Sequence, residues 1–193
     1  MKKKILLCIF VVVALFTITG CESKKDNTNK NDSNKESDNS TVVLYFSATG
    51  TTKSIAQRIA KESNSDIIEI IPKEKYKSED LNYNSDCRAN REQNDEKARP
   101  EIENVIDVSE YNTIYLGYPI WWGTNPKIIL TLLDTYDFTG KTIIPFCTSG
   151  SSDIKNSVED LRNYNSKLTI KDGKRFSSSD SDEVIKDFVS SNK

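Results

Sequence analysis

Short apolar runs alternate with amphipathic stretches along the chain from residue 41 onward. The apolar runs are rich in β-branched and aromatic residues, which is typical of strands. Between them, apolar residues recur three and four positions apart, which is typical of helices with one buried face. The predicted strands are Thr41–Phe46, Asp66–Ile71, Thr113–Tyr118, Lys141–Cys147 and Lys167–Ile170, and the predicted helices are Thr52–Ser63, Pro126–Tyr136, Ile154–Tyr164 and Ser181–Ser190.

This alternation predicts an α/β fold, with a parallel sheet covered by helices on both faces. Right-handed crossovers leave few topologies, and the order 2-1-3-4-5 suits five strands. Residues 41–193 are sufficient for one domain with a sizeable core. The helix after the third strand has its own start signal, because Asn125 suits the N-cap and Pro126 the first helical position.

One long stretch, 73–112, separates the second and third predicted strands and is too long for a plain turn. Within it, Asn84–Ala98 is polar and looks helical, ending before a proline. Its apolar face is weak, so it could be a loosely held flap. Whether it touches a ligand is left open by the sequence.

The first 40 residues differ in character from the rest. A basic start is followed by an apolar run, Ile5 to Ile18, which is too short to span a bilayer but suits the core of a signal peptide. The residues before Cys21 resemble the lipobox of bacterial lipoproteins, which implies cleavage after residue 20 and lipidation of Cys21; the alternative is an uncleaved signal anchor. Residues 22–40 contain no large apolar side chain, so we predict a disordered tether in an extracytoplasmic, membrane-anchored lipoprotein.

Composition excludes several classes of chemistry. The chain has 27 basic and 29 acidic residues and no histidine. Without histidine there can be no His-based triad, general base or metal ligand. There is no basic stripe, so nucleic acid is not expected as a partner. Cys87 and Cys147 remain after processing, and neither has a C-x-x-C spacing; an oxidising compartment would permit a disulfide, but we do not expect these two to pair.

The turn after the first strand is rich in hydroxyl groups around one glycine. Ser47-Ala48-Thr49-Gly50-Thr51-Thr52 leads directly into the first helix. Loop and first-turn N–H groups converge there, and the helix dipole favours an anion. The spacing matches neither a dinucleotide-binding nor a Walker motif. We therefore predict a phosphate cradle, with an ordinary capped βα turn as the alternative.

Two further turns follow the third and fourth strands. The first contains Pro119-Ile120-Trp121-Trp122-Gly123, and its indoles are suited to stacking on a flat ring. Adjacent residues point in different directions, so we expect one to stack, with Trp122 favoured; the alternative is that both pack inward. The second contains Thr148-Ser149-Gly150-Ser151, whose small residues could expose backbone groups to a ring edge or simply cap the next helix. The carboxyl ends of parallel strands are where open α/β sheets bind ligands.

Together, these turns resemble those of the flavodoxin family, and most closely its members with a G-Y-P-I-W-W loop. The Arg99-Pro100-Glu101-Ile102 stretch is also similar to that subgroup. The resemblance implies a flavodoxin-like three-layer fold over 41 to about 190, with FMN at the reversal of strand order between strands 1 and 3. The residues it assigns to FMN are Ser47, Ala48, Thr49, Gly50, Thr51 and Thr52 at the phosphate, Pro119, Ile120, Trp121, Trp122 and Gly123 beside the ring, and Thr148, Ser149, Gly150 and Ser151 at its pyrimidine edge.

The function implied is an FMN-binding electron-transfer lipoprotein at the outer membrane face. The flavin would carry the redox chemistry, so no side chain need act as acid or base. The expected partners are FMN, an unidentified redox protein or small acceptor, and a membrane reached only through the lipid. Two alternatives stay open: an FMN-dependent reductase of small quinone-type acceptors, and a flavin-free surface domain that binds a partner.

Overall fold

The computed structural model describes residues 40–193. The predicted signal peptide and lipidated tether, up to residue 39, lie outside the described residues. The strands are β1 (Thr41–Tyr45), β2 (Asp66–Glu69), β3 (Thr113–Pro119), β4 (Thr142–Thr148), β5 (Thr169–Ile170) and β6 (Lys174–Phe176); the helices are α1 (Thr51–Ser63), α2 (Arg88–Asn94), α3 (Lys127–Thr135), α4 (Lys155–Tyr164) and α5 (Asp182–Ser190), with a 3-10 turn, η1 (Ser78–Leu81).

The strands form one parallel sheet in the order β2-β1-β3-β4-β5, which confirms the predicted topology. Strand β6, which was not predicted, also pairs with β4, in parallel and closer to the carboxyl end of that strand. Thus β5 and β6 occupy one strand position in two pieces, interrupted at 171–173. The first piece is shorter than the predicted Lys167–Ile170.

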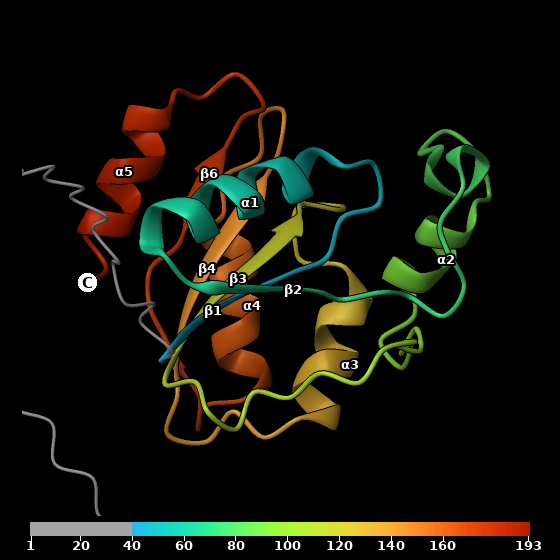
Figure 1. The fold of residues 1–193 in the computed structure, drawn as a ribbon. Coiled ribbons are helices and arrows are strands. Elements are labelled where there is room, and N and C mark those ends of the chain that lie inside the picture. The colour runs from blue at the N-terminus through green and yellow to red at the C-terminus, as the bar shows by residue number, and fades with distance from the viewer. Residues whose placement is uncertain (1–39) are drawn as a thin grey trace, which may run out of the picture. The chain divides into compact units, whose positions relative to one another are not determined.

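Alternation along the strands sends side chains into two separate cores. In β1, Val42 and Leu44 pack with α3 and α4, whereas Val43 and Tyr45 pack with α1 and α5. This is the period-2 arrangement expected of a sheet buried on both faces. The helices accordingly form a layer on each side of the sheet (Figure 1). No helix within 40–193 combines the length and apolar character needed to cross a membrane.

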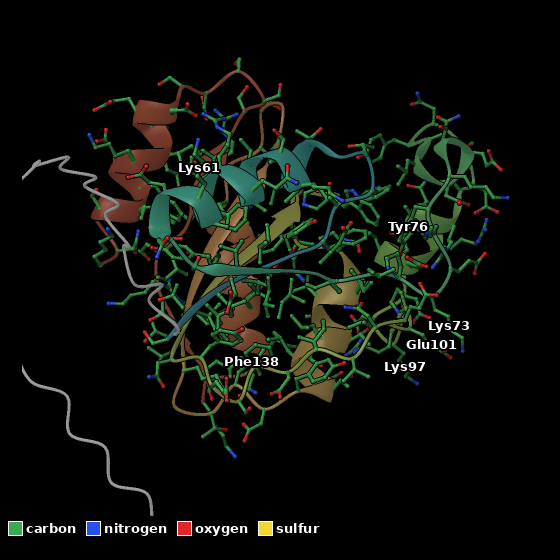
Figure 2. The ribbon with its side chains drawn as sticks, in the orientation of Figure 1. Lys61, Lys73, Tyr76, Lys97, Glu101 and Phe138 are labelled. Atoms are coloured by element: carbon green, nitrogen blue, oxygen red, sulfur yellow. The ribbon has the colours of Figure 1, made fainter. Side chains whose placement is uncertain are left out.

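Residues 73–100 form an arm that projects beside the sheet, around α2 (Figure 1). At its base the chain runs antiparallel to itself: the Lys73 N–H donates to the Glu101 carbonyl at 2.9 Å, and their side chains form an ion pair (Figure 2). The predicted helix Asn84–Ala98 is wrong at both ends, since α2 covers only Arg88–Asn94. Asn82 accepts a hydrogen bond from the N–H of Asn84, and such local turns compete with helix formation.

An aromatic side chain fixes the arm to the sheet. The ring of Tyr76 lies edge-to-face on Phe46 and Trp121, with centroids 5.7 and 5.0 Å apart. The Arg88 guanidinium lies 4.2 Å from the Tyr76 ring centroid. Arg88 also donates to Glu92 at 2.6 Å, and the Tyr76 hydroxyl donates to the same carboxylate. The arm is therefore docked, not loosely held.

The start of α3 differs from the predicted one. Pro126 is the N-cap and Lys127 the first helical residue, so Asn125 is not the cap. The Lys127 N–H donates instead to the side chain of Gln93 in the arm, at 3.1 Å. A distant residue thus replaces the local cap that the sequence suggested.

The two cysteines of the domain are buried and free. Burial raises the pKa of the Cys147 thiol to about 12. Cys87 caps α2, accepting a hydrogen bond from the Asn90 N–H at 3.4 Å. The raised pKa of Cys147 is that of a buried structural thiol and not of an activated thiolate.

Substitution of Gly117 by alanine is expected to lower the free energy of unfolding by about 1–3 kcal/mol, because it overpacks a closed core. A Cβ atom at this position would lie 2.1 Å from Cζ of Phe146, which is fully buried. Urea denaturation followed by far-ultraviolet circular dichroism measures the change. Gly150→Ala is the matched control, since its Cβ would meet nothing within 4 Å; equal stability of the two variants would contradict the packing argument.

Candidate functional site

The loop after β1 forms a cradle of N–H groups at the start of α1. Gly50 has φ +89°, a left-handed conformation that favours glycine, and α1 begins at the next residue. The Gly50 N–H donates to Ser47 Oγ at 3.1 Å, and the hydroxyl oxygens of Thr49 and Thr51 lie 3.4 Å apart. First-turn N–H groups have no acceptor within the helix and lie at the positive end of its dipole. The geometry is that of an anion-binding turn.

Thr148, at the end of β4, connects the three turns. Its hydroxyl lies 2.7 Å from that of Thr52 in the first turn of α1, and both side chains are buried. Its carbonyl accepts a hydrogen bond from the N–H of Ile120, in the loop after β3, at 3.0 Å. One residue therefore fixes the spacing of all three turns.

The loop after β3 is a tight turn. Trp121 and Thr124 exchange two backbone hydrogen bonds, of 2.9 and 3.0 Å, around Trp122 and Gly123. Both central residues have positive φ, +50° and +82°, as in a two-residue type I′ turn. For a bulky residue such as Trp122 this conformation costs about 1–3 kcal/mol, so the surrounding contacts must maintain it.

The turn sends the two indoles to different places. Trp121 is 3% exposed and packs edge-to-face on Phe46, with ring centroids 5.6 Å apart. Trp122 is 40% exposed, and its ring centroid lies 4.7 Å from that of Tyr83 in the arm. The inner position belongs to Trp121, and Trp122 lies at the rim.

A cavity of about 410 Å³ opens at the carboxyl ends of the strands, between the three turns and the arm. Its volume lies within the range of roughly 300–1,000 Å³ found for small-molecule sites. Nine predicted residues line it: Ala48, Thr49, Thr51, Pro119, Ile120, Trp121, Thr148, Ser149 and Gly150. The other predicted residues are near it but not in its wall: Ser47, Gly50, Thr52, Trp122, Gly123 and Ser151. That they contact a ligand stays a prediction.

Five wall residues were not predicted: Leu81 and Tyr83 from the arm, and Phe176, Ser177 and Ser178 from the end of β6. The β6 group did carry a signal, because Phe176-Ser177-Ser178 repeats the pattern of the first turn, an aromatic strand residue followed by hydroxyls. The arm residues carried none, since nothing local indicates which surface they reach.

The wall has two kinds of surface. Thr49 and Thr51 supply hydroxyl groups from the cradle, and the lining serines come from the turn after β4 and the end of β6, while Ile120, Trp121 and other apolar side chains make the rest. Among residues 40–193, those lining the cavity include no carboxylate, lysine or arginine. The cavity can therefore hold an anionic group joined to a flat apolar one, but offers no general acid or base from these side-chain types.

Replacing Thr148 by valine is expected to lower the free energy of unfolding by about 1–3 kcal/mol, because the Thr52 hydroxyl is left buried without its partner. Threonine and valine have nearly the same shape, so packing around position 148 is preserved. A double-mutant cycle with Thr52→Val measures the coupling by urea denaturation. The double variant should recover much of the loss; strictly additive losses would show that the hydroxyl pair does not join the turns.

Comparison with known proteins identifies the family to which this chain is similar. The flavodoxin family model matches residues 40–192. A candidate flavoprotein from Bacteroides uniformis is similar to this chain, with 38% identity and a TM-score of 0.76 over 79% of this chain and 98% of that one. Another, from Bacteroides eggerthii, has 35% identity and a TM-score of 0.75 over 78% and 96%.

A third similar structure is a flavoprotein from Lactobacillus acidophilus in complex with FMN. It has 30% identity and a TM-score of 0.60 over 71% of this chain and 93% of that one. No curated protein sequence matched. The family model and the similar structures span the domain that carries the three turns, and this chain belongs to the flavodoxin family.

Proposed function

We propose that this chain binds FMN in the cavity between the three turns and the arm. The observation that carries the proposal is the pairing of an anion cradle with an apolar, aromatic wall in one cavity of suitable volume. The similar flavoprotein from Lactobacillus acidophilus contains FMN, which supports it. Both parts of the wall fit the cofactor: hydroxyl and N–H donors suit a phosphate, and an indole suits a flat ring.

Different residues of the chain would bind different parts of FMN. Thr49 and Thr51, with the first-turn N–H groups of α1, would hold the phosphate. Trp121 would bound the ring on the sheet side, and Gly150 would offer its backbone groups to the polar edge of the ring. The other predicted residues would support these positions from outside the wall.

The proposed role is electron transfer. Bound FMN would supply reversible electron transfer, while the protein binds the cofactor and shields it from water. The wall residues within 40–193 include one ordinary titratable side chain, Tyr83, and burial raises the pKa of its hydroxyl. With no carboxylate, lysine or arginine lining the cavity among residues 40–193, the redox chemistry of this site would come from the flavin itself, as in an electron carrier.

The test is the visible spectrum of the purified chain after incubation with FMN. A flavin absorption band that survives gel filtration, with one FMN per chain, supports the proposal. A colourless protein with no measurable uptake would overturn it. Steady turnover of NAD(P)H with a small quinone by the loaded protein would favour the reductase.

We also propose that the domain is carried outside the cytoplasm on a lipid attached to Cys21. The support is the basic start, the apolar run of residues 5–18 and the lipobox-like residues before Cys21. Stable anchoring needs more than one acyl chain, because each buried CH₂ contributes only about 0.8 kcal/mol.

Cys21→Ser is expected to abolish incorporation of labelled fatty acid and to release the protein from the membrane fraction. Cys8→Ser is the control, because Cys8 lies in the predicted signal peptide and should not affect labelling. Continued labelling of the Cys21→Ser variant would argue against a lipoprotein.

A further inference from the structure

The side chain of Gln93 makes three hydrogen bonds, two to the loop after β3 and one to the first residue of α3. It lies in α2, in the arm, almost thirty residues from that loop in sequence. Its Nε2 amide donates to the carbonyls of Trp121 and Asn125, both at 3.3 Å, and its Oε1 accepts from the Lys127 N–H at 3.1 Å. Two carbonyls and one N–H allow a single orientation of the amide, so the assignment of its oxygen and nitrogen follows from chemistry.

These bonds span the strained turn. Trp121 is its first residue, and Asn125 immediately follows its last. Between them lie Trp122 and Gly123 with their positive φ angles. Such a conformation persists in a bulky residue only when neighbouring contacts determine it. Gln93 supplies such contacts at both ends and also satisfies the first free N–H of α3.

The arm that carries Gln93 also touches the cavity. Leu81 and Tyr83 line it, and the Tyr83 ring packs on Trp122 at the rim. The arm is also held by Tyr76, whose ring contacts Trp121. The arm therefore meets the tryptophan turn three times, through Tyr76, Gln93 and Tyr83.

We propose that Gln93 is a positioning residue for the cofactor ring: it holds the tryptophan turn in the conformation that shapes the ring side of the cavity. This inference rests on the proposed FMN function. It makes the arm part of the site, although the arm lies outside the strand-end turns that the sequence pointed to. Because Gln93 acts on the ring side and not on the cradle, its loss affects FMN and riboflavin equally.

The test compares wild type with Gln93→Leu, Gln93→Glu and the control Gln57→Leu, which makes the same replacement at an exposed position of α1. Dissociation constants for FMN and riboflavin are measured by flavin fluorescence, and near-ultraviolet circular dichroism of the flavin-free protein reports the packing of the tryptophans. Gln93→Leu is expected to weaken both ligands by the same factor, about tenfold, and to change the tryptophan signal. Gln57→Leu should change neither.

Gln93→Glu adds a pH profile that a general loss of stability would not produce. At neutral pH its carboxylate faces two carbonyl oxygens and cannot donate to them. As the pH falls toward the ordinary carboxyl pKa of about 4.3, the protonated acid can donate again. Relative to wild type at the same pH, its ring affinity should recover on acidification, whereas that of Gln93→Leu should not.

Unchanged ligand affinity together with an unchanged tryptophan signal in Gln93→Leu would overturn the inference. A loss of affinity for FMN alone, with riboflavin binding unchanged, would also overturn it. If Gln93→Leu does not fold, the pH profile of Gln93→Glu decides, and a flat profile counts against it. Failure of wild type to bind FMN would instead refute the proposed function, and the tryptophan signal of the flavin-free variants would still test whether Gln93 holds the turn.

Discussion

Replacing Trp121 by alanine is expected to lower the free energy of unfolding by about 3–5 kcal/mol, the range for removing a large aromatic side chain from a core. The indole is almost fully buried and contacts Phe46 from β1 and Tyr76 from the arm. Its loss leaves a cavity between the sheet and the arm, next to the proposed cofactor site. Urea denaturation followed by far-ultraviolet circular dichroism measures the effect without relying on tryptophan fluorescence.

Trp122→Ala is the matched comparison in the same turn. Its side chain is 40% exposed, so truncation should cost less than about 1 kcal/mol of stability. The same variant tests the sequence-based prediction that Trp122 stacks on the ring, which expects FMN binding to weaken by roughly 1–4 kcal/mol. Equal destabilisation by the two replacements would contradict the assignment of Trp121 to the inner position.

The sheet could be predicted from sequence because its signals are local. Each long strand is a short apolar run bounded by polar residues, and each crossover helix shows one apolar face. Parallel strands joined by right-handed crossovers then leave few possible orders. The piece that was missed, β6, has the sequence Lys-Arg-Phe, which offers one apolar residue and no alternation. Its pairing comes from the neighbouring strand β4, not from its own composition.

The structure and position of the arm could not be predicted from local sequence patterns. A polar stretch with helix-forming residues suggested one long helix, yet turns around Asn82 and the cap at Cys87 delay its start. The position of the arm depends on Tyr76 packing against Phe46 and Trp121, which are distant in sequence. That contact brings Leu81 and Tyr83 to the cavity, and no periodicity encodes it.

The sequence indicated which hydroxyl residues lie near the site, but not which of their hydroxyl groups line the cavity. Thr52 looked like one more donor for a phosphate, but its side chain turns inward to Thr148. A signal for this existed: Thr52 precedes Ile55, Ala56 and Ile59 at helical spacing and so shares their buried face. Thr49 and Thr51, off that face, remain at the cavity.

Riboflavin, which lacks the phosphate, is expected to bind about 100- to 10,000-fold more weakly than FMN. No lysine or arginine is among the cavity-lining residues of the described chain, and Lys53, in the first turn of α1, bonds Glu69 at 3.0 Å. The phosphate would therefore depend on N–H and hydroxyl donors at the helix start. Hydrogen bonds to a charged group contribute about 1.5–3 kcal/mol each, so two such bonds account for the expected ratio.

The ratio of the two dissociation constants, measured by fluorescence titration at several pH values, tests this account. A phosphate monoester loses its second charge below about pH 6, so FMN affinity should fall there while riboflavin affinity stays constant. Thr51→Ala should weaken FMN alone, because its hydroxyl lies 3.4 Å from that of Thr49 in the cradle, where the phosphate would bind. Equal affinity for the two flavins would mean that the helix start does not hold the phosphate, and the ring contacts alone would then have to account for binding.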